Sequence, residues 1–438
     1  MNPASRRALR WFFVFVSGLL LLATLVWGIA HQFAVDWPEP LPDVQTDPSS
    51  SSVLLPSEPD PFSVFYPPFL TALRSADLKP WMVDLEQGSR VAYAGRSSTE
   101  ILDPIADLRS DFQMLMGPRR PLGRMAKGLV LSERDPDGIY LASLLPFVRI
   151  SCAAAEAAAQ EGNWNRVQWL YVDALHYSLA LGQGGDLMHA AYADAGISLT
   201  LRCIRELLEI HQIPLASAAF LQTVVQEIEP ALEPLAEAYR RDLGTCLDAV
   251  KTLFEAGSSS GGFSFSPLAL RYASWQGSSV DQTSNHLRSL YQVSIAEAEA
   301  PYRFGKSRIA TFASMGRAPG CFVDDPVGRQ AAILYLPIDD SAIRQRLRLK
   351  VQCRVTAWAL GFEETGKPGM LPIDPFDPEG RPLRFQALHQ TGWRIWSIGE
   401  DQTDDGGHFP WAVNSKQHLD MCYQSNDLAR RRVYYATD

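Results

Sequence analysis

An unbroken apolar stretch, Trp11 to Ala30, stands out at the start of the chain because it contains no charged residue. A helix of about 20 residues at ~1.5 Å per residue covers the ~30 Å hydrocarbon core of a bilayer. Arginines at positions 6, 7 and 10 precede the stretch, and basic residues favour the cytoplasmic side of a membrane. We therefore predict a single-pass transmembrane helix at residues 11–30 of the inner (cytoplasmic) membrane. Residues 1–10 would then be cytoplasmic and the bulk of the chain extracytoplasmic.

A cleaved signal peptide is the alternative interpretation of this stretch. Gly28 and Ala30 are small residues at the spacing that a signal peptidase accepts. The apolar run is longer than the roughly 7–15 residues of a typical signal-peptide core. This length favours a retained anchor.

Three segments with different patterns of apolar residues lie between the predicted span and the last hundred residues. Residues 31–62 are rich in proline, serine and aspartate without periodicity, which predicts an extended linker. Residues 63–257 have a helical period and predict a helical domain, with stops at Gly162 and around Gly184 and with Asp186 as a helix cap. Residues 258–335 predict an irregular, partly helical connector.

One helical hairpin resembles a tetratricopeptide unit at Val167, Tyr171 and Ala174. A solenoid of such units repeats every 34 residues and requires about three stacked copies. One repeat further along the chain, the middle position is Arg205, and its charge breaks the pattern. The sequence therefore leaves two interpretations, a plain helical bundle, which the missing period favours, or a TPR-like domain.

Residues 336–438 predict a small α+β module. Apolar residues recur at helical spacing after Ser341 and end at Gly361; they are Ile343, Leu347, Val351, Val355, Trp358 and Ala359. We expect the basic residues of this helix to lie mostly on its exposed surface. Short strands are predicted at Leu383–Ala387 and Trp393–Ile398, followed by an acidic, glycine-containing loop. The predicted fold class is thus mostly α, with a long helix and a short antiparallel sheet at the C-terminus.

This module carries the pattern L-P-x-D-P-F, a glycine, P-L-R-F and W-x-I-W-S-I-G-E-D-x-x-D-D-G-G. The pattern resembles the C-terminal part of the major pseudopilin of type II secretion. It is closer to a group of uncharacterised single-anchor bacterial envelope proteins that carry this module after a helical region. A D-P-V-G element at 325–328 also matches that group. The resemblance implies a periplasmic location and envelope or secretion proteins as partners.

The resemblance also implies a calcium site in the acidic loop. It assigns the ligands to Asp401, to Asp404 or Asp405, and to a main-chain carbonyl near Ile398. A pseudopilin assembles through a hydrophobic helix that runs directly into its globular domain, whereas the apolar stretch here lies some three hundred residues upstream. The module is therefore expected to share the fold and not the filament-forming role.

The residue types in this loop support calcium independently of the resemblance. Glu400, Asp401, Asp404 and Asp405 supply hard oxygen ligands beside flexible glycines. A solvated acidic turn is the alternative, because aspartate and glycine favour turns in any case. The spacing does not follow the best-defined calcium loop.

The net charge argues against one class of partner, whereas the cysteines do not indicate a disulfide pattern. The net charge of −9 argues against a nucleic-acid partner, because phosphate binding requires a concentrated basic face. The six cysteines form no C-x-x-C pair, and the sequence selects none of their disulfide pairings.

The sequence contains no recognisable catalytic motif. His408 and His418, with Asp404 and Asp405, are the one cluster suited to a transition metal, at a spacing that is not diagnostic. The leading hypothesis is a non-enzymatic, membrane-anchored binding or scaffold protein of the bacterial envelope. The alternative is a metal-dependent or other hydrolase with its site between the helical domain and the acidic loop.

Overall fold

The computed structural model describes residues 97–102, 139–210, 213–256, 279–305, 341–365, 367–388, 392–404, 406–407 and 421–425. The predicted membrane span, the linker and the D-P-V-G element lie outside these ranges. Helices contain 71% of the described residues and a small antiparallel sheet accompanies them, which confirms the mostly α fold class. No helix within these ranges combines the length and the apolar character needed to span a membrane.

The described residues belong to two compact units. The larger unit takes the residues up to Arg241, residues 297–305 and the residues from Ser341 onward, and the smaller unit takes residues 242–256 and 279–296. The predicted boundaries separated a helical domain (63–257) from a C-terminal module (336–438). In the structure, most of the described helical region and the module form one unit.

Five helices among the described residues lie wholly in the larger unit before its C-terminal part. They are α4 (Ser98–Leu102), α6 (Ile139–Gln160), α7 (Trp164–Gly182), α8 (Leu187–Ile210) and α9 (Leu215–Ala231). The predicted stops at Gly162 and around Gly184 match the ends of α6 and α7, and the predicted cap at Asp186 is confirmed at α8. The Asn163 side chain accepts a hydrogen bond from the Arg166 N–H at 3.2 Å, and the Asp186 carboxylate accepts one from the His189 N–H at 3.0 Å.

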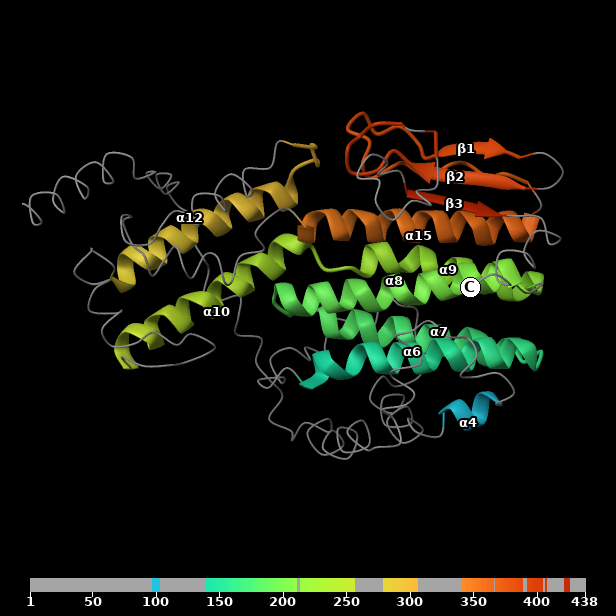
Figure 1. Cartoon of the computed structure of the whole chain (residues 1–438), viewed down its shortest axis with the longest axis horizontal. Coiled ribbons are helices and arrows are strands. Elements are labelled where there is room, and N and C mark those ends of the chain that lie inside the picture. The colour runs from blue at the N-terminus through green and yellow to red at the C-terminus, as the bar shows by residue number, and fades with distance from the viewer. Residues whose placement is uncertain are drawn as a thin grey trace, which may run out of the picture. The chain divides into compact units, whose positions relative to one another are not determined.

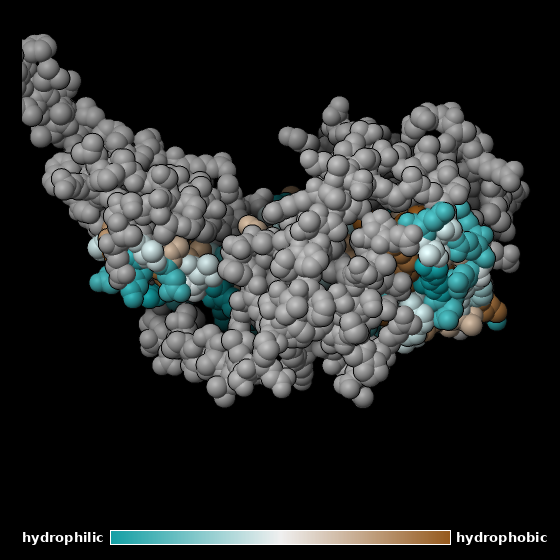
Figure 2. Space-filling view, turned by 90° about the horizontal axis from the view of Figure 1, so that it is seen from below, coloured by the Kyte–Doolittle hydropathy of each residue, from teal (hydrophilic) through white to brown (hydrophobic). Residues whose placement is uncertain are grey.

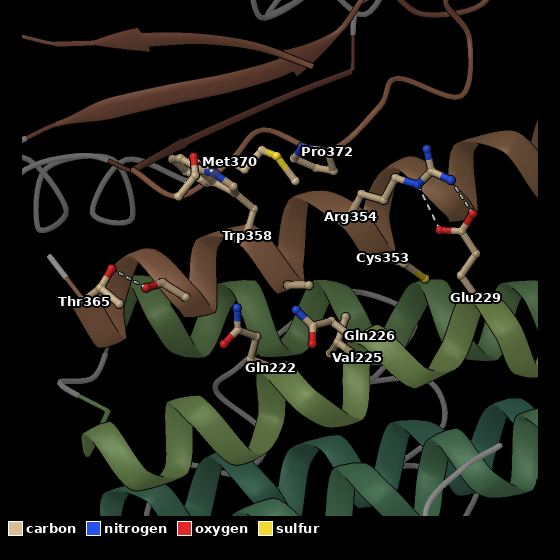
Figure 3. Close-up of a pocket in the computed structure, with 13 residues that line it drawn as sticks. Gln222, Val225, Gln226, Glu229, Cys353, Arg354, Trp358, Thr365, Met370 and Pro372 are labelled. Carbon is tan, nitrogen blue, oxygen red and sulfur yellow. Dashed lines mark hydrogen bonds and ion pairs between the residues drawn. The ribbon is translucent and has the colours of Figure 1, made fainter. Parts of the chain in front are cut away.

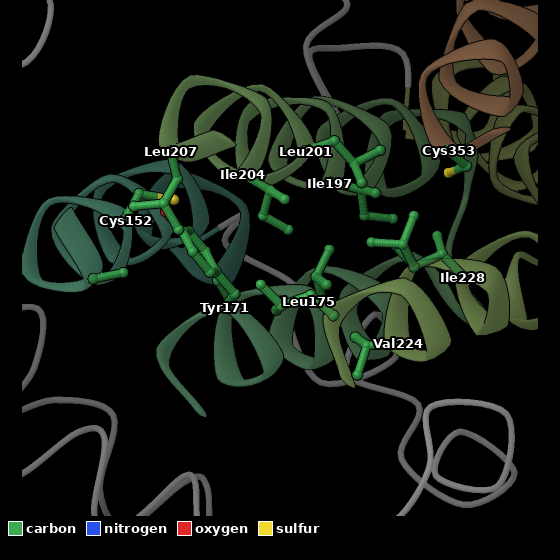
Figure 4. Close-up of a cluster of buried hydrophobic side chains, with 14 of the residues drawn as sticks. Cys152, Tyr171, Leu175, Ile197, Leu201, Ile204, Leu207, Val224, Ile228 and Cys353 are labelled. Atoms are coloured by element: carbon green, nitrogen blue, oxygen red, sulfur yellow. The ribbon is translucent and has the colours of Figure 1, made fainter. Parts of the chain in front are cut away.

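The apolar faces of these helices meet in one core. α6, α7 and α8 pack against one another, α4 packs on α6, and α9 packs on α7. Figure 4 shows the meeting point of the buried side chains, which include Tyr171, Leu175, Ile197, Leu201, Ile204, Val224 and Ile228. The described surface visible in Figure 2 is mainly hydrophilic, as expected where the apolar side chains have been removed to an interior.

Helix α15 (Ser341–Thr365) lies between the helical layers and a sheet (Figure 1). The sheet has the order β1 (Arg384–Ala387), β2 (Trp393–Ser397), β3 (Met421–Ser425), with both pairs antiparallel. One side of α15 packs against α8 and α9, and β2 and β3 pack on another side. The first two strands were predicted from alternating patterns, whereas β3 was not.

An aromatic cluster joins α15 to the sheet. The Trp393 ring lies 5.0 Å from Trp358 and 5.4 Å from both Phe362 and Tyr423, measured between centroids. Phe385 of β1 packs on Trp358 at 5.3 Å. Aromatic rings bury large areas and prefer such tilted and edge-to-face arrangements, so this cluster fixes the sheet on α15.

Arg205, the charged residue that interrupts the tetratricopeptide pattern, makes contacts that explain a charge at this position. The Arg205 guanidinium on α8 donates to the Thr356 hydroxyl of α15 at 2.9 Å and lies 5.9 Å from the Tyr423 ring centroid. The Tyr423 hydroxyl donates to the Arg205 carbonyl at 3.2 Å. Arg205 therefore connects the helical bundle to α15 and β3, a role that an apolar repeat residue cannot fill.

Arg346 is an exception to the expectation that the basic residues of α15 lie mostly on its exposed surface. Its side chain is 8% exposed, donates to the Asp194 carboxylate at 2.8 Å and also donates to the Glu233 carbonyl. Because α15 is covered on two sides, a charge there loses its water and needs a partner. Asp194 is equally buried, and burial raises the pKa of its carboxyl group while Arg346 and Lys350 act to lower it.

Helix α10 (Leu235–Ala256) begins in the larger unit, and its residues from Asp242 onward belong to the smaller unit. The smaller unit also contains most of α12 (Val280–Glu299). Tyr291 of α12 is buried, and its hydroxyl donates to the Asp242 carboxylate of α10 and lies 3.1 Å from the Cys246 sulfur. Burial, with the negative charge of Asp242 beside it, raises the pKa of Tyr291. This hydrogen bond holds the two helices together and keeps the phenol neutral.

Candidate functional site

The acidic loop follows β2 and is held in place by its neighbours. Gln402 has a left-handed backbone (φ 58°), and its side-chain amide donates to the carbonyls of Tyr302 (3.1 Å) and Phe376 (2.9 Å). Gly407 has φ 64°, and a Cβ there would lie 2.7 Å from the Trp396 ring. The loop is therefore packed against the sheet and the 302–304 segment.

Glu400, a predicted calcium ligand, points into the protein. Its side chain is 4% exposed and forms ion pairs with Arg344, at 3.4 Å, and with Arg348. Two guanidinium groups of α15 thus neutralise this carboxylate. Glu400 anchors the loop to α15.

Asp404, another predicted ligand, also has protein partners. One carboxylate oxygen accepts hydrogen bonds from the Trp396 indole N–H (2.9 Å) and the Gly406 N–H (3.0 Å), and the other lies 3.3 Å from the Arg384 Nε. Burial alone disfavours the charged form, but these hydrogen bonds and Arg384 lower the pKa of Asp404. The carboxylate stays charged and tied to the sheet.

The remaining predicted ligands are less constrained. The Asp401 carboxylate accepts one hydrogen bond, from the Thr403 N–H at 3.2 Å, and Ile398 is buried with its N–H donating to Asp374. Asp405, His408 and His418 lie outside the described residues. Within the described ranges, no three His, Cys, Asp or Glu side chains are grouped in a way that could hold a metal ion. The calcium site stays a prediction.

Two aspartates that the sequence analysis did not single out organise the approach to this loop. Asp374 is 1% exposed and accepts hydrogen bonds from the Ser397 hydroxyl (2.7 Å) and the Ile398 N–H (2.9 Å). Asp377 accepts from the guanidinium groups of Arg381 and Arg384, both at 2.9 Å. The signal was present in the D-P-F-D run, because aspartates near proline commonly bind turn backbone.

Asp377 gives the module a dependence on acid pH. Burial disfavours its charge, but Arg384, the Glu379 N–H and Arg381 together lower the pKa of Asp377. A lowered carboxyl pKa contributes stability above the unfolded value, about 3.9, and loses it as pH falls through the folded value. We expect the free energy of unfolding to decrease as the pH is lowered below about 4. Asp377→Asn should flatten that decrease and should itself lower the free energy of unfolding by about 1.5–3 kcal/mol at pH 7. Urea unfolding between pH 7 and 3 measures both; an unchanged pH slope in the variant would contradict the assignment.

A groove lies along the C-terminal half of α15. It has a volume of about 380 Å³ and is lined by thirteen residues of α9, α15 and the segment after α15. Figure 3 shows α15 as its floor, with Gln222 and Gln226 of α9 along one side and Met370 and Pro372 along the other. Small residues of α15, among them Ala357 and Gly361, leave the space open.

Gly361 has a different role from the predicted helix stop. Helix α15 continues past it to Thr365, and a Cβ at Gly361 would lie 2.4 Å from the Gln222 amide nitrogen. At the other end, the Arg354 guanidinium donates to both carboxylate oxygens of Glu229. The helices α9 and α15 are therefore antiparallel along the groove, and the absence of a side chain at 361 allows Gln222 to reach across.

The charged and reactive groups of the groove are already engaged. Arg354 pairs with Glu229 and also donates to the Ile373 carbonyl at 2.6 Å. Burial, with the charges of Glu229 and Asp194 nearby, raises the pKa of the Cys353 thiol, so this sulfur is not a thiolate. The amides of Gln222 and Gln226 have no hydrogen-bond partner among the described residues. The described residues that line the groove thus present amide donors and acceptors, a mutually neutralised Arg354–Glu229 pair and a protonated Cys353 thiol.

The comparisons with known proteins add no relative to this description. No protein-family model matches the chain, and neither a curated protein nor a solved structure matches it.

Proposed function

We propose that the protein is a membrane-anchored, extracytoplasmic binding or scaffold protein of the bacterial envelope, with other envelope proteins as partners. The groove along α15 is the observation that carries this proposal. It combines two amides that have no partner among the described residues with an exposed methionine, while its carboxylate and its guanidinium neutralise each other. Such a surface suits recognition by contact and hydrogen bonding.

The elements that form the groove are packed against one another, and this packing supports the same function. Its floor, α15, packs on α8 and α9 and carries the aromatic cluster of the sheet, so the two sides are fixed relative to each other. A binding surface held in one geometry loses less conformational freedom when the partner arrives. The anchor at residues 11–30 and the linker at 31–62 would hold this surface outside the membrane.

Chemical cross-linking of the full-length chain in bacterial membranes tests the proposal. We expect the protein to sediment with membranes that resist alkaline extraction, to be degraded by protease added to spheroplasts, and to enter a discrete complex with another envelope protein on a native gel. A monomer without adducts, or a chain recovered in the cytoplasm, would contradict the proposal.

We also propose a weak calcium site in the acidic loop, limited to Asp401, Asp405 and the Ile398 carbonyl. Glu400 and Asp404 are occupied by arginines, so the residues present fit only a site with few ligands. Extracellular calcium sites of low affinity have dissociation constants of about 10⁻⁴–10⁻³ M.

Calcium at 10 mM should then stabilise the folded chain by about 1.4–2.7 kcal/mol. Thermal unfolding of the full chain in detergent, with calcium and with chelator, measures the effect. Asp401→Ala should abolish it and Asp281→Ala, an exposed acidic residue of α12, should not. Equal thermal unfolding midpoints with and without calcium would contradict the proposed calcium site.

A further inference from the structure

We infer that the groove along α15 binds a short, extended and uncharged segment of a partner polypeptide, with an apolar side chain placed against Met370 and Trp358. This inference rests on the proposed binding function and specifies its site and the chemistry of its ligand.

The length of the groove matches a few residues of extended chain. Gln222 and Glu229 mark its two ends on α9. Seven residues of helix at ~1.5 Å each span about 10 Å. An extended chain advances ~3.3 Å per residue, so about three residues fit between the ends.

The charge of the groove selects an uncharged occupant. Arg354 directs its guanidinium to Glu229 and to the Ile373 carbonyl, so both charges are satisfied before a ligand arrives. A charged side chain entering the groove would lose water without gaining a free counter-charge. A neutral segment has no such cost.

The amides of α9 suit the backbone of that segment. Gln222 and Gln226 each carry a carbonyl acceptor and two N–H donors, and neither bonds to another described residue. A peptide group offers the complementary N–H and C=O. The spacing of four residues places both amides on one face of α9, toward the groove (Figure 3).

The apolar contact lies on the opposite side. Met370 is 96% exposed, the largest exposure of any large apolar side chain in the described ranges, and Trp358 packs beneath the same segment with its indole N–H 3.5 Å from the Gly369 carbonyl. Flexible methionine side chains adapt to varied apolar partners. The groove is partly open, which suits a segment of a larger molecule better than a small ligand that must be mostly buried.

A random heptapeptide library displayed on phage, selected on the full-length chain in nanodiscs, tests the inference. We expect enriched peptides to share an apolar residue flanked by uncharged residues. Their affinity should fall at least tenfold with Met370→Glu and with Gln226→Glu. The matched controls Met188→Glu and Gln160→Glu, which change exposed residues outside the groove, should leave affinity within twofold.

Each outcome separates the groove from the general function. Because residues 370 and 226 are exposed, circular dichroism of the variants should match that of the parent chain. Peptides that bind the groove variants normally, or a library without enrichment, would overturn the inference. If the native complex with an envelope partner still forms with the groove variants, the binding function stands and the groove assignment fails.

Discussion

Trp393→Ala is expected to lower the free energy of unfolding by about 3–5 kcal/mol, the range for removing a large buried aromatic side chain. Trp393 is 3% exposed and contacts Trp358, Phe362 and Tyr423. Its loss opens a cavity between the sheet and α15. Trp393→Phe keeps an aromatic ring in the cluster and should cost less.

The same variant tests whether the bundle and the module share a core. Since α15 packs on α8 and α9 as well as on the sheet, we expect the helical far-ultraviolet signal and the aromatic near-ultraviolet signal to disappear in one transition, shifted to lower denaturant. An aromatic transition that precedes the helical one in Trp393→Ala would show that the module unfolds independently.

Arg346→Met is expected to lower the free energy of unfolding by about 3–5 kcal/mol, because it leaves the buried Asp194 carboxylate without its partner. Combining it with Asp194→Leu should recover much of the loss, since an apolar pair needs no desolvated charge. Arg202→Met is the matched control: Arg202 is 63% exposed and lies 3.9 Å from Glu206, so its loss should cost about 1 kcal/mol or less.

The cost of Arg346→Met should also depend on pH in a defined direction. The pKa of Asp194 is already raised by burial, and removing Arg346 raises it further. A raised carboxyl pKa favours the folded state at low pH, and this contribution is lost as pH rises through the folded value. The deficit relative to the parent chain should be smaller at pH 5 than at pH 8. Urea unfolding at the two pH values measures it; an equal deficit, or a double variant no more stable than the single one, would contradict this account of the pair.

Local signals predicted the helices well. Asp186 could be predicted as a helix cap because the capping geometry involves only the next three residues. The strands at Arg384–Ala387 and Trp393–Ser397 followed from alternation and turn residues, which are also local.

Contacts between distant residues were beyond such signals. Gly361 looked like a helix end, yet its small size serves the approach of Gln222, 139 positions earlier in the chain. Glu400 was predicted as a calcium ligand from its residue type, and no local pattern indicated that its carboxylate pairs with Arg344 and Arg348 of α15. In each case the chemical character of the residue is clear from the sequence. Its partner depends on how α15 packs, and no periodicity in the sequence specifies that packing.

The groove was missed for the same reason. Its residues come from α9, α15 and the segment after α15, and no short motif joins them. The glutamines of α9 carry no signal in the sequence, because a polar residue on a helix surface is ordinary. They become informative only when α15 lies beside them and their amides have no partner in the part of the chain that the structure describes.

Site-specific photo-cross-linking in living cells tests the central claim most directly. A photo-reactive residue replaces Thr365, an exposed residue that lines the groove, or, as a control, Gln160 at the exposed end of α6 in the full-length chain. We predict an adduct from position 365 alone, mapped to an uncharged, apolar-containing segment of an envelope protein and abolished by Met370→Glu. Equal labelling from both positions, or an adduct that persists in Met370→Glu, would contradict the assignment of α15 and α9 as the binding surface.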